Sequence, residues 1–293
     1  MKRAEQRAAY VFILPWLIGF LCLTLGPIIA SIVLSFTDYD GLRALRFIGL
    51  ENYKTMFFGD PTVWKSLGNT FYMVLGVPLS IIVSLLLALA LNKDIRGVRF
   101  YRTFFYFPSI VPTVANSILW LWILQPQFGL LNSALSLIGI DGPMWLGDPA
   151  WSKPALILMS LWATGPNMII YLAGLKNIPN EFYDAAKVDG ASGWAMFRHI
   201  TLPLLTPSIF YTAVMGLIST LQTFTQAFIM TGGGPVESTY FYMLHLFNNA
   251  FAFFRMGYAS ALAWFLFIII AAFTYLQFKS SKYWVHYEMG GGA

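Results

Sequence analysis

Long apolar segments alternate with short polar segments along this chain of 293 residues. A helix needs about 20 predominantly apolar residues to cross the hydrocarbon core of a bilayer. Six segments reach that length, and they are predicted to span a membrane at 10–36, 66–91, 103–124, 154–175, 205–229 and 257–278. The connecting segments are too short for a separate soluble domain. The predicted fold class is therefore all-α, a polytopic membrane protein with a single transmembrane domain over 1–293.

The composition supports this prediction. Charged residues make up 11% of the chain and hydrophobic residues 58%, whereas soluble domains carry about 25% charged residues. The basic residues are scattered among the loops, so the net charge of +5 does not indicate a nucleic-acid partner. The single cysteine, Cys22, excludes an internal disulfide. The N-terminus resembles a signal peptide, but the segment 10–36 is too long for one and lacks a small-residue cleavage site, which predicts a retained first span.

The distribution of Lys and Arg predicts the orientation, because cytoplasmic loops of membrane proteins are enriched in both. With the N-terminus in the cytoplasm, 12 of the 18 basic residues lie on the inner side. Both termini are therefore expected inside, and so is the polar connection 176–204 between the fourth and fifth spans. The outer loops are rich in Gly, Pro and aromatic residues, as in TGGGPVEST at 231–239. Such loops are typical either of surface cover or of a docking site.

The spans contain almost no ionisable residue, which argues against the proton relay that proton-driven carriers keep in the bilayer. Sodium sites built from backbone carbonyls remain open. The chain has no GxxxxGK(S/T) nucleotide loop and no GxSxG, and its three histidines are far apart, so no metal site is expected. The chain is therefore expected not to be an enzyme. If it is part of a pump, the energy must come from another subunit.

Uncharged polar residues do occur in the spans. Asn167 follows the helix-loosening pair Gly165-Pro166, and amides and hydroxyls cluster near the end of the fifth span. Such groups beside aromatic rings suit a sugar or polyol, which offers many hydrogen-bonding groups and no charge. Hydrogen bonding between helices is the competing interpretation for each single residue. The candidate substrate path consists of Gly165, Asn167, Thr220, Gln222, Thr223 and Gln226.

The connection 176–204 carries more local structure than a simple link requires. Asn177 or Asn180 can cap a first short helix, and Gly190 suits a left-handed stop after it. Ser192 can cap a second short helix, and Pro203 is expected to end it. A loop with two amphipathic helices around a turn is typical of a segment that transmits force to a soluble partner.

This segment resembles the signature loop of the permeases of ABC importers, usually written EAA, three residues, Gly, nine residues and Ile-x-Leu-Pro. Here it reads Asp184-Ala185-Ala186, three residues, Gly190, nine residues and Ile200-Thr201-Leu202-Pro203. Asp184 stands where the pattern has Glu, which keeps the charge and shortens the reach. The flanking sequence, with TGGGP at 231–235 and GYASALAWFLFIII at 257–270, is similar to the maltose/glycerol-phosphate/lactose-type permeases.

The resemblance implies a permease subunit of an ATP-driven, binding-protein-dependent sugar importer in a bacterial or archaeal plasma membrane. It also implies a second, related permease subunit, an external solute-binding protein and two cytoplasmic ATPase subunits that use ATP and Mg²⁺, while this chain binds no cofactor itself. The connection 176–204 would then be a coupling helix docked on the ATPase. The residues implied in that coupling are Asp184, Ala185, Ala186, Gly190, Ile200, Leu202 and Pro203.

Two other functions remain open from the residues alone. An autonomous secondary transporter or facilitator of a small polar solute would work without ATP. An assembly or signalling protein would use the loop as a docking platform and transport nothing, so that changes at Asn167 or Gln222 would leave growth on nutrients untouched.

Overall fold

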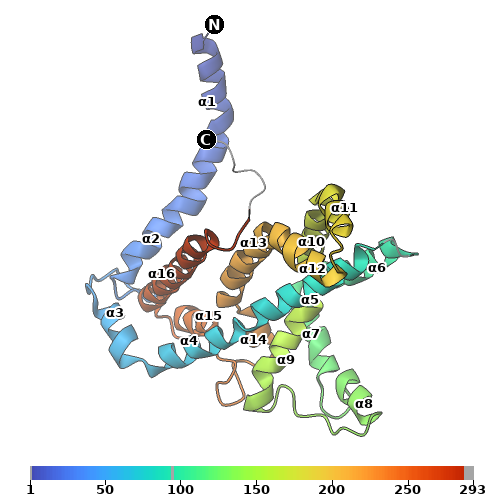
Figure 1. Ribbon diagram of the computed structural model, residues 1–293. Helices are drawn as coiled ribbons and strands as arrows, with labels where there is room; N and C mark the ends of the chain where they lie inside the picture. The colour runs from blue at the N-terminus through green and yellow to red at the C-terminus, as the bar shows by residue number, and fades with distance from the viewer. Residues whose placement is uncertain (1, 94–95, 287–293) are drawn as a thin grey trace. The chain divides into compact units, whose positions relative to one another are not determined.

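The computed structural model describes residues 2–93 and 96–286 (Figure 1). Residues 1, 94–95 and 287–293 of the predicted domain lie outside the described residues. Within the described part the regular structure is helical, apart from one isolated bridge between Thr37 and Phe47. The predicted all-α fold class is confirmed.

Four described helices are long and apolar enough to cross a membrane. They are Tyr10–Ser35, Pro61–Leu91, Gly193–Leu221 and Met256–Ser281. Two bent pairs of helices raise the number to six if each pair is one span. These pairs are Val98–Ile110 with Thr113–Ile123, bent by 101°, and Pro149–Trp162 with Gly165–Asn177, bent by 48°. The described residues thus hold four to six candidate spans, each overlapping one of the six apolar segments.

The chain divides into two compact units, one formed by Met1–Val63 with His245–Ile269 and the other by Trp64–Leu244 with Ile270–Ala293. The first unit holds α1 (Lys2–Gly19), α2 (Gly26–Ser35), α3 (Glu51–Lys54) and parts of α15 (Tyr242–Phe247) and α16 (Met256–Ser281). The second unit holds most of α4 (Pro61–Met73), then α5 (Gly76–Leu91), α6 (Val98–Tyr106), α7 (Thr113–Ile123), α8 (Leu130–Ser136), α9 (Pro149–Trp162), α10 (Gly165–Asn177), α11 (Asn180–Val188), α12 (Gly193–Met196), α13 (Leu202–Leu221) and α14 (Thr225–Met230).

Two widened, π-type turns carry helices past a proline. They cover Phe20–Leu25 and Phe197–Thr201, and each ends two residues before a proline, at Pro27 and Pro203. In a regular α-helix the proline ring clashes with the carbonyl four residues back. A π-type turn changes the position of that carbonyl, so the helix can continue. Gly193–Leu221 is therefore one helix, and the prediction that Pro203 ends the second loop helix is wrong.

In the first unit, a buried hydrogen-bonded group surrounds Asp60. Its carboxylate accepts a hydrogen bond from the Tyr258 hydroxyl at 2.9 Å and lies 3.0 Å from His245 Nε2. Burial alone would raise the pKa of Asp60, but the hydrogen bond from Tyr258 and the charge of His245 outweigh it and hold the pKa below its usual value of 3.8. The structure therefore favours the ionised carboxylate.

The substitution Asp60→Asn should lower the free energy of unfolding by about 1–3 kcal/mol, because two buried polar groups lose a charged acceptor. Since the folded-state pKa is lowered, the stability that this carboxylate supplies is complete above about pH 4 and disappears only as the pH falls through the folded value. A thermal melt of the detergent-solubilised protein measures the change. Asp38→Asn is the control, because the Asp38 side chain is 65% exposed. Equal melting temperatures for the two variants would contradict the assignment.

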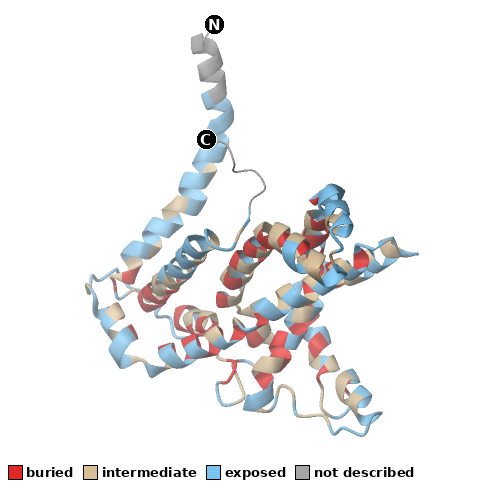
Figure 2. Cartoon of the chain, in the orientation of Figure 1, coloured by how far each residue is buried: buried red, intermediate tan, exposed pale blue. Residues whose placement is uncertain are grey.

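In the second unit, α5 contacts α9, α10 and α13. One buried cluster includes Trp120 and Leu156, and another includes Tyr171 and Leu172. The Tyr171 and Thr212 hydroxyls share a hydrogen bond of 2.5 Å that joins α10 to α13. Figure 2 shows the contrast in burial, with buried residues along α9, α10 and α13 and mostly exposed residues over 10–34 of α1 and α2.

The loop 231–239, which the sequence predicts to face outward, is fastened to neighbouring helices of the second unit. Lys65 Nζ lies 2.6 Å from a Glu237 carboxylate oxygen, which ties the loop to α4. The hydroxyls of Ser152 and Ser238 are 2.8 Å apart and tie it to α9. The loop is a packed element, and its role as cover or docking site stays a prediction.

Candidate functional site

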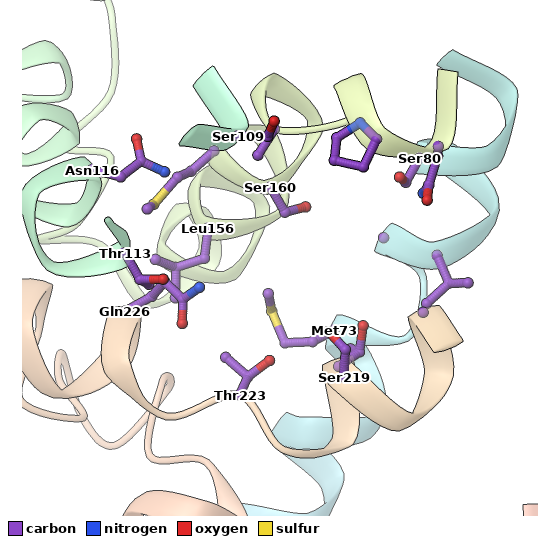
Figure 3. A pocket seen from close by; sticks show the side chains of 18 of the residues that line it. Met73, Ser80, Ser109, Thr113, Asn116, Leu156, Ser160, Ser219, Thr223 and Gln226 are labelled. Carbon is purple, nitrogen blue, oxygen red and sulfur yellow. The ribbon is translucent and has the colours of Figure 1, made fainter. Parts of the chain in front are cut away.

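The second unit contains a partly open cavity of about 440 Å³. Its wall comes from four pairs of helical segments: α4 with α5, the turn Phe107–Ile110 with α7, α9 with α10, and α13 with α14. The volume lies within the range of about 300–1,000 Å³ found for small-molecule sites. Figure 3 shows side chains from all four pairs around an open centre, among them Ser80, Asn116, Ser160 and Thr223.

All four pairs of segments are interrupted beside this cavity. The interruptions fall at 111–112, 163–164 and 222–224, and at 74–75, where two turn residues interrupt the long helix Pro61–Leu91 without a sharp bend. Residues at or next to each of them line the wall, namely Met73, Gly76, Val111, Thr113, Ala163 and Thr223. Broken helices are tolerated at membrane depth where the freed backbone faces protein or a cavity. Transporters build substrate sites from such discontinuous helices, so the convergence of four breaks marks this cavity as the candidate site.

The polar groups of the wall are all uncharged. Among the described residues no Asp, Glu, Lys, Arg or His lines the cavity, and half of the lining residues carry a hydroxyl or an amide. These residues are Ser80, Ser109, Thr113, Asn116, Ser160, Asn167, Thr212, Ser219, Thr220, Thr223 and Gln226. Hydroxyls both donate and accept hydrogen bonds, and amides offer two donors and one acceptor oxygen. The wall can therefore bind a ligand rich in hydroxyl groups, and it contributes no group that could balance a charge.

Asn116 is the lining residue with an unused buried acceptor. It is 8% exposed, and its Oδ1 is buried without a hydrogen-bond partner in the described structure. An unpaired buried acceptor costs about 1–3 kcal/mol. Because Oδ1 has almost no accessible surface, a ligand hydroxyl in the cavity would reach it only after the Asn116 side chain turns. Asn116 therefore combines a position in the cavity wall with an unused hydrogen-bond acceptor, which makes it a candidate substrate contact.

Four of the six residues predicted for the substrate path line this cavity: Asn167, Thr220, Thr223 and Gln226. The two others do not. Gln222 is exposed and its amide donates to the carbonyl of Ile218 at 3.2 Å, within its own helix. The remaining residue, Gly165, has a packing role instead.

Gly165 permits a close approach between α10 and α6. A Cβ at this position would lie 2.6 Å from the carbonyl oxygen of Phe105 and 2.7 Å from Tyr106 Cα. Because both neighbours are backbone atoms, they cannot move aside as a flexible side chain could. Gly165 thus shapes the region of the break without contributing to the cavity wall.

Several lining residues were not predicted, among them Asn116, Ser109, Thr113 and Ser160. For two of them the sequence held a signal. Ser109 follows Pro108 and Thr113 follows Pro112, which repeats the pattern of a polar residue after a helix-breaking proline that singled out Asn167. Asn116 and Ser160 lie inside helices α7 and α9, where only the packing brings them to the wall.

The connection 176–204 folds as two helices around a turn at Gly190. Gly190 has φ +74°, its N–H donates to the Lys187 carbonyl at 3.0 Å, and the Ala191 N–H donates to the Ala186 carbonyl at 2.9 Å. This is the Schellman arrangement, which favours glycine at the left-handed position. The predicted cap at Ser192 is confirmed, because its Oγ accepts from the Ala195 N–H at 3.3 Å.

The start of α11 differs from the prediction. The helix begins at Asn180 with Pro179 as its N-cap residue, and no side chain caps it. Neither Asn177 nor Asn180 has the predicted capping role. Proline is tolerated at a helix start because the first N–H groups have no partner inside the helix.

The seven residues of the signature differ in exposure. Asp184, Ala185 and Gly190 are exposed, and Asp184 pairs with Lys187 at 2.9 Å on the surface of α11. The others, Ala186, Ile200, Leu202 and Pro203, are half-buried. The Tyr183 hydroxyl lies 2.9 Å from the hydroxyl of Thr201, which links α11 to the π-type turn before α13.

The loop also exposes large apolar side chains. Phe182, Val188 and Trp194 are 47%, 88% and 69% exposed, and Figure 2 shows α11 as mostly exposed. Exposed apolar groups gathered on one short segment mark an interaction surface. The hydrogen bond between Tyr183 and Thr201 connects this exposed segment to the start of the helix that reaches the cavity.

Residues 76–280 match the family model described as the binding-protein-dependent transport system inner membrane component. The chain is 47% identical over 291 residues to the probable ABC transporter permease protein YesP of Bacillus subtilis (strain 168), covering 98% of this chain and 94% of the relative. It is 35% identical over 290 residues to the lactose transport system permease protein LacF of Rhizobium radiobacter, covering 96% of each.

A solved structure of a bacterial ABC transporter involved in the import of the acidic polysaccharide alginate contains a similar chain. The TM-score is 0.84 at 25% identity, and the alignment covers 95% of this chain and 96% of that one. The family model and the full-length relatives agree with the resemblance of the 184–203 segment. The chain therefore belongs to the family of binding-protein-dependent transport system inner membrane components, which are non-catalytic, multi-pass permeases of ABC transporters.

Proposed function

We propose that this chain forms half of the translocation path of an ATP-driven, binding-protein-dependent sugar importer. The observation that carries the proposal is the cavity at four helix breaks, whose wall offers hydroxyls and amides and no charge. That chemistry complements a saccharide, and the lactose-transport relative supports the same class of solute. Any charge on the solute would have to be met by another chain.

The proposed orientation places both termini and the segment 176–204 in the cytoplasm. The excess of Lys and Arg on that side supports it. The segment then acts as the coupling helix, with α11 and its exposed apolar side chains seated on an ATPase subunit. The Schellman turn at Gly190 and the hydrogen bond between Tyr183 and Thr201 make the segment stiff enough to move as a lever.

The proposed assembly contains this chain, a second and related permease subunit, two cytoplasmic ATPase subunits and an external solute-binding protein. ATP and Mg²⁺ bind to the ATPase subunits, and this chain binds no cofactor. The assembly lies in the plasma membrane of a bacterium or an archaeon. The binding protein docks on the outer loops and delivers the solute.

The proposed mechanism is alternating access. Closure of the ATPase dimer on ATP moves the coupling helix, and the continuous helix Gly193–Leu221 carries that movement to the wall residues Ser219 and Thr220. The breaks beside the cavity allow half-helices to tilt, so the cavity opens outward. Hydrolysis returns it to the inward-facing state.

The solute class is tested with the solute-binding protein of the proposed assembly. We expect isothermal titration to show binding of a mono- or oligosaccharide, and the complete assembly to take up the same compound. Binding of amino acids, peptides or metal ions with no saccharide bound would contradict the proposed solute class.

The substitution Asp184→Lys should weaken co-purification with the ATPase by about 10-fold. It removes the ion pair with Lys187 and places two like charges on the docking face of α11. Affinity purification of the assembly through the tagged permease, followed by quantification of the ATPase subunit, measures the effect. Asp141→Lys is the matched control, because it makes the same charge change on an exposed residue of an outer loop. Unchanged ATPase recovery with Asp184→Lys would contradict the docking role.

A further inference from the structure

A second cavity, of about 500 Å³, lies beside α6 in the same unit. Its wall comes from α5, α6, the turn that follows α6, and the end of α9. Aromatic and aliphatic side chains dominate the wall, including Leu87, Phe104 and Trp162, and the polar side chains are two threonines. Such a wall cannot bind the sugar proposed above. It suits a hydrocarbon chain.

The helix α6 presents an apolar face to this cavity. Phe100, Thr103 and Phe104 line the cavity at i, i+3 and i+4 of α6, which is one face of an α-helix, and Phe107 continues the wall in the turn that follows α6. Phe100, Phe104 and Phe107 remain 69%, 61% and 63% exposed. The cavity is therefore open toward its surroundings along these rings.

The start of α6 carries a concentration of positive charge. Lys93, Arg96, Arg99 and Arg102 stand against the single acid Asp94, so the segment 93–102 has a net charge of +3 (four minus one). Lys93, Arg96 and Arg99 are exposed, and none of the four basic side chains forms an ion pair with a carboxylate of the described residues.

Arg102 has a separate, structural role. Its guanidinium donates to the carbonyl of Leu91 at 2.8 Å, at the C-terminal end of α5. A cation at that end is favoured by the helix dipole and by the unpaired carbonyls. This contact fixes the start of α6 against α5, so Arg96 and Arg99 are the arginines left for a ligand.

From this arrangement we infer a binding site for an anionic phospholipid. The phosphate lies at Arg96 and Arg99, and an acyl chain follows the aromatic face of α6 into the cavity. The two arginines come before the apolar residues of α6 along the chain, as the charged headgroup of a phospholipid comes before its acyl chains. Basic groups at the cytoplasmic ends of spanning helices attract anionic headgroups. The inference rests on the proposed orientation, which places this end of α6 at the inner leaflet.

The first test is lipid retention by the complete transporter assembly. The assembly is reconstituted in phosphatidylcholine vesicles containing phosphatidylglycerol and extracted in mild detergent. Native mass spectrometry then measures the mass of the lipid bound to it. We expect bound phosphatidylglycerol on the wild type and about 10-fold less on the double variant Arg96→Gln/Arg99→Gln. The control is Arg43→Gln/Arg46→Gln, which removes two arginines from the proposed outer side. Equal retention by the two double variants would overturn the inference.

A photo-crosslinking amino acid in place of Phe104 provides a second, position-specific test. The comparison position is Phe12, 84% exposed on the first span. Adducts at Phe12 should follow the bulk lipid composition, and adducts at Phe104 should be enriched in phosphatidylglycerol. The same lipid ratio at both positions, or a protein adduct at Phe104 from the second permease subunit, would overturn the inference. Neither readout needs transport, so ATP-driven uptake in the same vesicles tests the proposed function separately.

Discussion

The substitution Gly190→Pro should reduce ATP-driven uptake to background while the protein still inserts into the membrane. Proline fixes φ near −65°, whereas Gly190 has φ +74° and uses its N–H to bind the Lys187 carbonyl. The cost of about 3 kcal/mol or more would break the turn between α11 and α12. Insertion should be unaffected, because Gly190 lies outside the candidate spans. Uptake by reconstituted assemblies and membrane abundance of the permease are the two measurements.

Gly190→Asn is the matched control for this experiment. Asparagine tolerates the left-handed conformation, and a Cβ at position 190 would meet no atom within 4 Å. We expect this variant to retain most of the uptake. Normal uptake by Gly190→Pro would show that the turn does not transmit force. Loss of uptake in both variants would mean that the side chain, rather than the backbone geometry, causes the defect.

The double substitution Asn116→Leu/Asn167→Leu should lower kcat/KM for solute uptake by about 100-fold. It removes two amides from the cavity wall, including the unpaired Oδ1 of Asn116. Each hydrogen bond lost to a buried ligand costs about 1–3 kcal/mol, and 1.4 kcal/mol is a factor of ten. Leucine has the same number and branching of side-chain heavy atoms as asparagine, so the change in the shape of the wall should be small. Initial uptake rates over a range of solute concentrations measure the change.

Gln222→Leu makes the same change from amide to hydrocarbon close to the cavity but outside its lining. We expect its kcat/KM to stay within about twofold of the wild type, because in the described part of the chain its amide donates to a carbonyl of its own helix. The ATPase activity of the assembly without solute should be the same with the wild type, the double variant and Gln222→Leu. A double variant that matches Gln222→Leu in kcat/KM would contradict the placement of the substrate path in this cavity.

The helical fold class and the local chemistry of the loop could be predicted because both depend on neighbours in sequence. Apolar length predicts a span, and a left-handed glycine or a capping serine acts within one turn. The conformation at Gly190 and the cap at Ser192 were predicted for that reason. The error at Pro203 has a local cause too. Proline usually ends a helix, and the π-type turn Phe197–Thr201 that accommodates it leaves no signal in hydropathy.

The helix breaks that form the cavity are a different case. The break at 222–224 falls inside the predicted span 205–229, so apolar length alone predicts one helix there. That break changes the direction in which successive side chains point. Thr223 faces the cavity and its neighbour Gln222 does not. Asn116 was missed because its importance depends on the packing of α7 against other helices, which a single apolar segment does not encode.

The central claim, that this chain is a path driven by a separate ATPase, is tested most directly by reconstitution. Proteoliposomes receive either this chain alone or the complete assembly with its second permease subunit, ATPase subunits and binding protein. Accumulation of labelled saccharide against a gradient is then followed with and without ATP. We expect accumulation only by the complete assembly with ATP. Accumulation by this chain alone, without nucleotide, would contradict the claim.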